Sequence, residues 1–161
     1  MNQASGDDWG AASAGRIAGI DYGPVRIGIA LADPRAGIAS PYESYQRRGR
    51  EADAERFRRL VADERVCHFV VGVAVHASGH ESRLSSAARA FGAWLEQVTG
   101  VPVSFFDERF SSAEAEQHLS AAGLTRKQRR SRLDPLAAQI MLTAYLESGG
   151  RSDEGTQPLE G

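Results

Sequence analysis

The amino-acid sequence predicts an α/β fold in which helices flank a mixed five-stranded sheet, and three observations support this prediction. Short apolar segments at residues 16–21, 25–32 and 38–45 follow one another closely enough to form antiparallel strands. Residues 66–75 are almost continuously apolar and β-branched, as expected for a central parallel strand buried on both faces. Helical and strand-like segments then alternate, which is typical of parallel strands covered by helices.

The individual elements follow from local patterns. Residues 22–24, Tyr-Gly-Pro, are typical of a turn and predict a hairpin between the first two strands. Apolar residues recur at helical spacing over 54–61 and again over 84–98, where Gly100 supplies a stop signal. Residues 101–106 predict the fifth strand.

Two more helices are predicted towards the carboxyl end. Ser111 and Glu114 have the spacing of a capping box, which predicts a short helix that ends at Gly123. Asp134 followed by Pro135 has the pattern of an N-cap and first helical residue, so the last helix is expected to run from there to about residue 147. This order of elements is that of an RNase H-like domain.

Length and composition predict one domain over residues 15–148, with disordered tails at 1–14 and 149–161. No apolar segment approaches the roughly 20 residues that span a bilayer, and the first residues do not resemble a signal peptide. The single cysteine, Cys67, has no internal partner. We therefore expect a cytoplasmic protein without membrane contact.

Four acidic residues stand where chemistry is expected. Asp21 closes the first strand, Asp107 and Glu108 close the fifth, and Asp134 precedes the last helix. Sites in parallel α/β sheets gather at the carboxyl ends of strands, and converging carboxylates need a cation to offset their repulsion. Oxygen ligands favour Mg²⁺ or Mn²⁺, and two such ions suit phosphodiester cleavage.

Each acid also has a purely structural interpretation. Asp21 can form an Asx-turn, Glu108 can pair with Arg109, and Asp134 can cap a helix. Strand alternation says only that Asp107 and Glu108 point to opposite faces, so either can be the second ligand. The prediction of a site depends on the acids occurring together.

Three segments carry a resemblance to a known family. The segments DYGPVRIGIALAD from Asp21, DERFSSAEAE from Asp107 and RLDPLAAQIMLTAYLES from Arg132 resemble, in order and spacing, the motifs of the YqgF/RuvX family of RNase H-like nucleases. The resemblance implies a metal-dependent endonuclease that processes the 5′ end of pre-16S rRNA or resolves Holliday junctions. It implies that Asp21, Glu108 and Asp134 are both the catalytic residues and the ligands of Mg²⁺ or Mn²⁺.

Basic residues border these acids and indicate a nucleic-acid partner, although the net charge is −2. Arginines gather at residues 47–59 and 126–132. Salt bridges for Arg26 and Arg109, and a solvated loop at 126–132, are the simpler alternatives. The residues predicted to bind phosphate are Arg26, Arg109, Arg126, Lys127, Arg129, Arg130 and Arg132.

The chain departs from the family pattern at two places: residues 73–80 lack the usual proline and asparagine, and Pro24 replaces a small hydroxyl residue. Structured RNA is the favoured partner and branched DNA the alternative, and both a monomer and a homodimer are compatible with the sequence. A non-catalytic nucleic-acid-binding module is a second class of function. A phosphate-binding turn of the sugar-kinase type is a third, but it requires another domain for which 161 residues leave no room.

Overall fold

The computed structural model describes residues 15–73, 83–107 and 126–149, with the backbone alone over 126–134. The predicted helix at 111–123 lies outside these residues, as do both predicted tails except Gly149. The strands and helices are β1 (Arg16–Asp21), β2 (Arg26–Asp33), β3 (Ile38–Gln46), α2 (Arg50–Glu64), β4 (Val66–Val73), α3 (Arg83–Thr99), β5 (Val103–Asp107) and α5 (Arg126–Glu147).

The strands form one five-stranded sheet in the order β3-β2-β1-β4-β5. β1 and β3 both pair antiparallel with β2, whereas β4 lies parallel to β1 and to β5. The predicted mixed sheet, with three antiparallel strands followed by parallel ones, is therefore confirmed. Because β1, β4 and β5 run parallel, their carboxyl ends lie at the same edge of the sheet.

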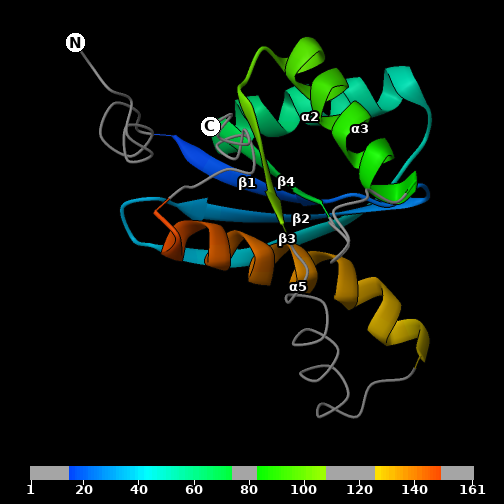
Figure 1. The fold of residues 1–161 in the computed structure, drawn as a ribbon. Helices are drawn as coiled ribbons and strands as arrows, with labels where there is room; N and C mark the ends of the chain where they lie inside the picture. Colours follow the sequence, from blue (N-terminus) through cyan, green and yellow to red (C-terminus); the bar gives the residue numbers. More distant parts are fainter. Residues whose placement is uncertain (1–14, 74–82, 108–125, 150–161) are drawn as a thin grey trace, which may run out of the picture.

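Helices cover both faces of the sheet (Figure 1). On one face, α2 and α3 enclose a core that includes Ile20, Phe57, Phe69, Phe91 and Leu95, which we call the α2–α3 core. On the other face, α5 lies alone over a second set of buried side chains, the α5 core. Successive residues of β1 alternate between the two, since Ile17 belongs to the α5 core and Ala18 to the α2–α3 core.

The last helix differs from the prediction. α5 begins at Arg126, so Asp134 lies inside the helix and is not its N-cap, and Pro135 is an interior residue. Proline in a helix removes one backbone donor, here the one that would bond the carbonyl group of Ser131. The nine residues before it, 126–134, are nevertheless helical, so the basic segment at 126–132 is not the loop that a short charge run suggests.

α5 is seated on β1 through a glycine. A Cβ atom at Gly19 would lie 2.9 Å from the Leu142 Cβ and 3.2 Å from the Ala138 carbonyl oxygen. Contacts this short leave no room for any side chain at Gly19. The helix backbone therefore approaches the sheet more closely here than it could over alanine or any larger residue.

None of the helices in the described residues is both long enough and apolar enough to cross a membrane.

Replacement of Gly19 tests the close contact between α5 and β1. We expect Gly19→Ala to lower the free energy of unfolding by about 1–3 kcal/mol, because the added methyl group must push α5 away from β1. Gly19→Val should cost more than Gly19→Ala. Urea denaturation followed by circular dichroism measures both. An alanine variant as stable as the parent would show that the helix is not held this closely.

Candidate functional site

Asp21 ends β1 on the face of the sheet that α5 covers. Strand alternation places it there, because Ile17 packs in the α5 core and Gly19 meets Leu142 of α5. Asp21 is partly buried, and it takes part in interactions within the protein. The turn that follows needs glycine, since a Cβ at Gly23 would lie 2.4 Å from the Arg26 carbonyl oxygen. The predicted hairpin therefore fixes where the strand ends and where this carboxylate lies.

Glycines flank Asp21 on both neighbouring strands. Gly28 of β2 pairs directly with Asp21. On the other side, Ile20 pairs with Val71, so the next register step brings Asp21 level with Gly72 of β4. Neither neighbour carries a side chain beyond its α-carbon. Of Asp21, Gly28 and Gly72, only Asp21 has a side chain with a functional group.

Asp107 shares the edge with Asp21 but lies on the opposite face. It ends β5 and pairs with Val73 of β4, whose side chain belongs to the α2–α3 core. Phe105, two residues earlier, also packs against that core, whereas Phe106 packs against the α5 core. Glu108 and Arg109 themselves lie outside the described residues.

The backbone of α5 brings Asp134 to the same level as Asp21. In Figure 1, α5 runs back along the sheet, opposite to β1, from its yellow start to its red end. Ala138 lies over Gly19. One helical turn before Ala138 is Asp134, about 6 Å away, and two strand residues after Gly19 is Asp21, also about 6–7 Å away in the same direction. The two positions therefore approach each other at this edge.

Among the predicted basic residues, Arg26 is the one whose side chain is described. It begins β2 and is partly buried, and its position two residues before Gly28 puts it on the α5 face near Asp21. It takes part in interactions within the protein. The others on α5 are placed by backbone alone, in the helical turns that precede Asp134: Arg126, Lys127, Arg129, Arg130 and Arg132.

A buried network supports this edge from the other face, and sequence reasoning missed it. The carboxylate of Asp53 is fully buried. Its oxygens accept hydrogen bonds from the Tyr45 hydroxyl at 2.6 Å, the Arg48 backbone N–H at 2.9 Å and the Arg47 Nε at 3.2 Å. Arg47 also donates from Nη1 to the hydroxyl of Tyr22 at 3.0 Å. Tyr22 follows Asp21 directly, so the network reaches the end of β1.

Titration reflects this network. Burial alone would raise the pKa of Asp53, but the hydrogen bonds from Arg48, Tyr45 and Arg47 and the charge of Arg47 outweigh it and lower that pKa. Burial and the bond to Asp53 together raise the pKa of Tyr45 to about 12. The signal in the sequence was an acid in an apolar helical stripe, since Asp53, Phe57 and Leu60 lie four and three residues apart.

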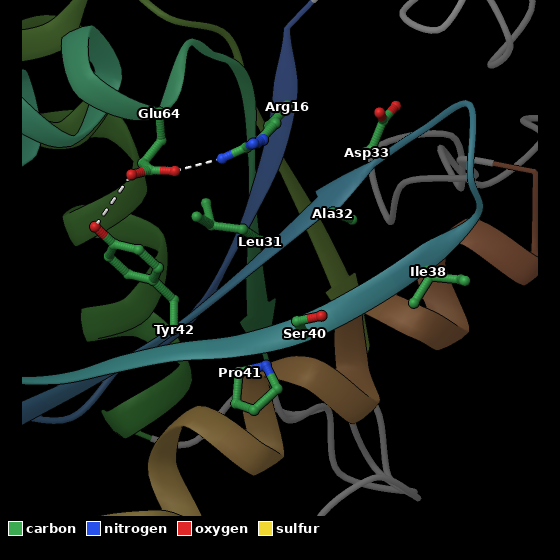
Figure 2. Close-up of a pocket in the computed structure, with 9 residues that line it drawn as sticks. All are labelled: Arg16, Leu31, Ala32, Asp33, Ile38, Ser40, Pro41, Tyr42 and Glu64. Carbon is green, nitrogen blue, oxygen red and sulfur yellow. Dashed lines mark hydrogen bonds and ion pairs between the residues drawn. The ribbon is translucent and has the colours of Figure 1, made fainter.

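A cavity of about 320 Å³ lies at the opposite end of the sheet (Figure 2). It is lined by residues that include Arg16 at the start of β1 and Asp33 at the end of β2. Glu64 accepts an ion pair from Arg16 and a long hydrogen bond of 3.5 Å from Tyr42. These groups lie a full strand length from Asp21, so this cavity is not part of the acidic edge.

The number of metal-ligating side chains at the described edge limits the binding of a cation there. Within residues 15–73, 83–107 and 135–149, whose side chains the structure describes, no three His, Cys, Asp or Glu side chains lie together as a metal site. One carboxylate on an open, glycine-flanked face can hold a hard cation only with further oxygen ligands.

Comparisons with known proteins agree with this architecture. A model of the RuvX family, described as Holliday junction resolvases, matches residues 15–148. A relative from Rhodopirellula baltica is 42% identical over 139 residues, which cover 86% of this chain and 80% of the relative. A relative from Koribacter versatilis is 35% identical over 145 residues, covering 90% and 94%. Both carry names that assign them, provisionally, as pre-16S rRNA nucleases.

Solved structures share the fold. RuvC from T. thermophilus, in complex with a Holliday junction substrate, superposes with a TM-score of 0.52 at 17% identity and covers 86% of this chain and 98% of its own. The fowlpox virus resolvase, in complex with Holliday junction DNA, gives 0.51 at 10% identity and covers 83% and 97%. The predicted RNase H-like fold is confirmed.

The Asp53 network makes a prediction about stability and pH. We expect Asp53→Asn to lower the free energy of unfolding by about 2–3 kcal/mol at neutral pH, because the buried Tyr45 hydroxyl and the partly buried donors of Arg47 and Arg48 lose a charged acceptor. The pKa of Asp53 is lowered from 3.8, so its contribution is complete above that value and is lost as the pH falls below it. Urea denaturation from about pH 7 to pH 2 should show the difference from the parent shrinking below about pH 4.

The matched control is Glu55→Gln, which removes an exposed carboxylate from the same helix. Its ion pair with Arg59 spans 3.4 Å at the surface, and its loss should change stability by less than about 1 kcal/mol. A constant cost of Asp53→Asn across the whole pH range would contradict the lowered pKa.

Proposed function

Since this chain belongs to the RuvX family and is a nuclease, we propose that it is a divalent-metal-dependent endonuclease that matures the 5′ end of pre-16S rRNA. The observation that carries the proposal is the position of Asp21. It ends the central strand, between two glycines, on the face where α5 passes with Asp134 in its backbone. The names of the relatives from R. baltica and K. versatilis support the choice of rRNA as substrate.

We assign catalysis and metal binding to Asp21, Glu108 and Asp134. Asp21 and position 134 lie at one level on the α5 face, and alternation along β5 favours Glu108 over Asp107 for that same face. Asp107 pairs with Val73 on the side of the α2–α3 core. Of the two neighbouring acids, we therefore propose Glu108 as the ligand.

The donor set fits Mg²⁺ or Mn²⁺. All three proposed ligands are carboxylates, and the glycines beside Asp21 leave the face open for oxygen ligands from solvent and substrate. A divalent cation bound there would lower the pKa of water and stabilise the charge that develops on phosphate. The carboxylates hold the ion and fix its position relative to the scissile phosphate.

Basic residues hold the nucleic acid. Arg26 lies at the same edge and face as Asp21, where a guanidinium can donate two hydrogen bonds to one phosphate. Arg126, Lys127, Arg129, Arg130 and Arg132 precede Asp134 in one continuous helix, so a strand bound along these turns leads towards the acids. Arg109 follows Glu108 in the chain and is assigned the same role at the third acid.

Resolution of Holliday junctions is the second candidate, because the matching family is described by that activity. Symmetric cleavage of a four-way junction would call for a two-fold dimer, whereas processing of one RNA end needs only a monomer. We place the protein in the cytoplasm, where precursor rRNA is processed in bacteria such as those of its relatives.

A cleavage assay tests the function. With Mn²⁺ or Mg²⁺, the parent should cleave a precursor small-subunit rRNA end in preference to a four-way DNA junction, and chelation by EDTA should abolish cleavage. Asp21→Asn should lower the rate at least about a hundredfold and leave nucleic-acid binding intact, because it removes a metal ligand only. The matched control is Asp33→Asn, at the other end of the hairpin, which should cleave like the parent. Equal cleavage by Asp21→Asn and Asp33→Asn would refute the site.

A second experiment distinguishes Asp107 from Glu108 as the metal ligand. We expect Glu108→Gln to reduce cleavage about as much as Asp21→Asn. Asp107→Asn should reduce it by less than about tenfold, because Asp107 lies on the face of the sheet that carries the α2–α3 core. Single-turnover cleavage rates with saturating Mn²⁺ measure both. The opposite order would make Asp107 the ligand.

A further inference from the structure

We propose that Arg48 and Arg50, where the turn after β3 meets the start of α2, bind backbone phosphates of the nucleic-acid substrate beside the acidic edge. The inference rests on the proposed function and extends it to a second contact surface. That surface lies across the sheet from the basic turns of α5, and neither arginine belongs to the resembling motifs.

Sheet register places the turn at the right edge. β3 ends at Gln46, which pairs with Arg26 at the start of β2, and the Arg47 N–H donates to the Val25 carbonyl oxygen at 2.9 Å. Ser44 is level with Asp21, because both pair with Gly28. From strand spacing and rise, Arg48 then lies roughly 15 Å from Asp21, which is about four base pairs of a duplex at ~3.4 Å each.

The turn is held rigidly. Asp53 accepts the Arg48 backbone N–H at 2.9 Å, and its own N–H donates to the Gly49 carbonyl oxygen at 2.8 Å. Gly49 has a φ of 114°, a conformation that side chains disfavour. These constraints fix the backbone before any ligand arrives, so little backbone conformational entropy is lost when the arginines bind phosphate.

The arginines of this segment divide into two groups. Arg47 turns inward, against the rings of Tyr22 and Phe91, with its guanidinium carbon 5.4 and 5.6 Å from their centroids. Further along α2, the arginines bind protein partners: Arg56 pairs with Glu43, Arg59 pairs with Glu55, and Arg58 donates to the Val98 carbonyl oxygen. In the part of the chain that the structure describes, Arg48 and Arg50 are exposed and form no ion pair of this kind.

A groove continues from Arg50. A space of about 530 Å³ between α2 and α3 is lined on the α2 side by Arg50, Glu51, Ala54, Glu55 and Arg58, and on the α3 side by Trp94 and Val98. A strand that leaves Asp21 past Arg48 and Arg50 therefore meets a concave path and not a packed surface. The two glutamates balance the two arginines within this groove, so the charge that favours a phosphate is that of Arg48 and Arg50 at its entrance.

The test measures binding without cleavage. In an Asp21→Asn background, fluorescence anisotropy with the precursor rRNA end and the four-way DNA junction compares Arg48→Ala/Arg50→Ala with the unsubstituted background. We expect affinity to fall about tenfold or more, and the slope of log affinity against log salt to become shallower by about 1 to 2, because two phosphate contacts are lost. The control Arg35→Ala removes an arginine from the β2–β3 turn at the opposite edge and should change neither quantity.

A second variant separates charge from folding. Arg48→Lys/Arg50→Lys keeps both charges and should recover most of the affinity, whereas a structural defect would persist. Affinity and salt slope of the double alanine variant equal to those of Arg35→Ala would overturn the inference, as would a background protein that binds neither nucleic acid. A parent that binds normally but cleaves nothing would refute the proposed catalysis and leave the binding result to stand on its own.

Discussion

The close approach of α5 to β1 at Gly19 is the contact on which the arrangement of the acidic edge depends. The Leu142 Cβ and the Ala138 carbonyl group lie where a side chain of residue 19 would be. This contact fixes the distance between the helix and the sheet. From that seat, one helical turn leads to position 134 and two strand residues lead to Asp21. A helix held farther away would separate Asp21 from position 134, the two positions to which we assign metal binding, and metal–oxygen distances of about 2 Å tolerate little displacement.

The two faces of the sheet have separate tasks. The α5 face carries Asp21, the glycines at 28 and 72, and Arg26. The opposite face carries the larger aromatic core, where Phe57 packs edge-on against Tyr45, Phe69 and Phe91. Because neighbouring residues of a strand point to opposite faces, Phe106 and Asp107 are adjacent in sequence yet face different environments. The carboxylate that lies between two glycines at this edge is that of Asp21, on the face covered by α5.

Asp53 connects these two halves. Its buried carboxylate is costly to desolvate, and it is retained here with three donors around it, from Tyr45, Arg47 and Arg48. Arg47 extends the network to Tyr22, next to Asp21. One buried charge thus fixes the end of β3, the start of α2 and the residue that follows β1. The same arrangement turns one arginine of the 47–50 segment inward and leaves its neighbours at the surface.

The sequence by itself determined the five strands, the helices α2 and α3, and the order of the acids, because alternation, helical spacing and turn chemistry are properties of neighbouring residues. It did not predict the start of α5: Asp134 and Pro135 have the pattern of a helix start, yet the loss of one hydrogen bond at proline did not end the helix. Nor did it assign Asp107 to a face of the sheet, or show that Asp53 is buried. Only the tertiary structure decided these points, because a residue's face acquires meaning from the helix packed upon it, and that helix comes from a distant part of the chain.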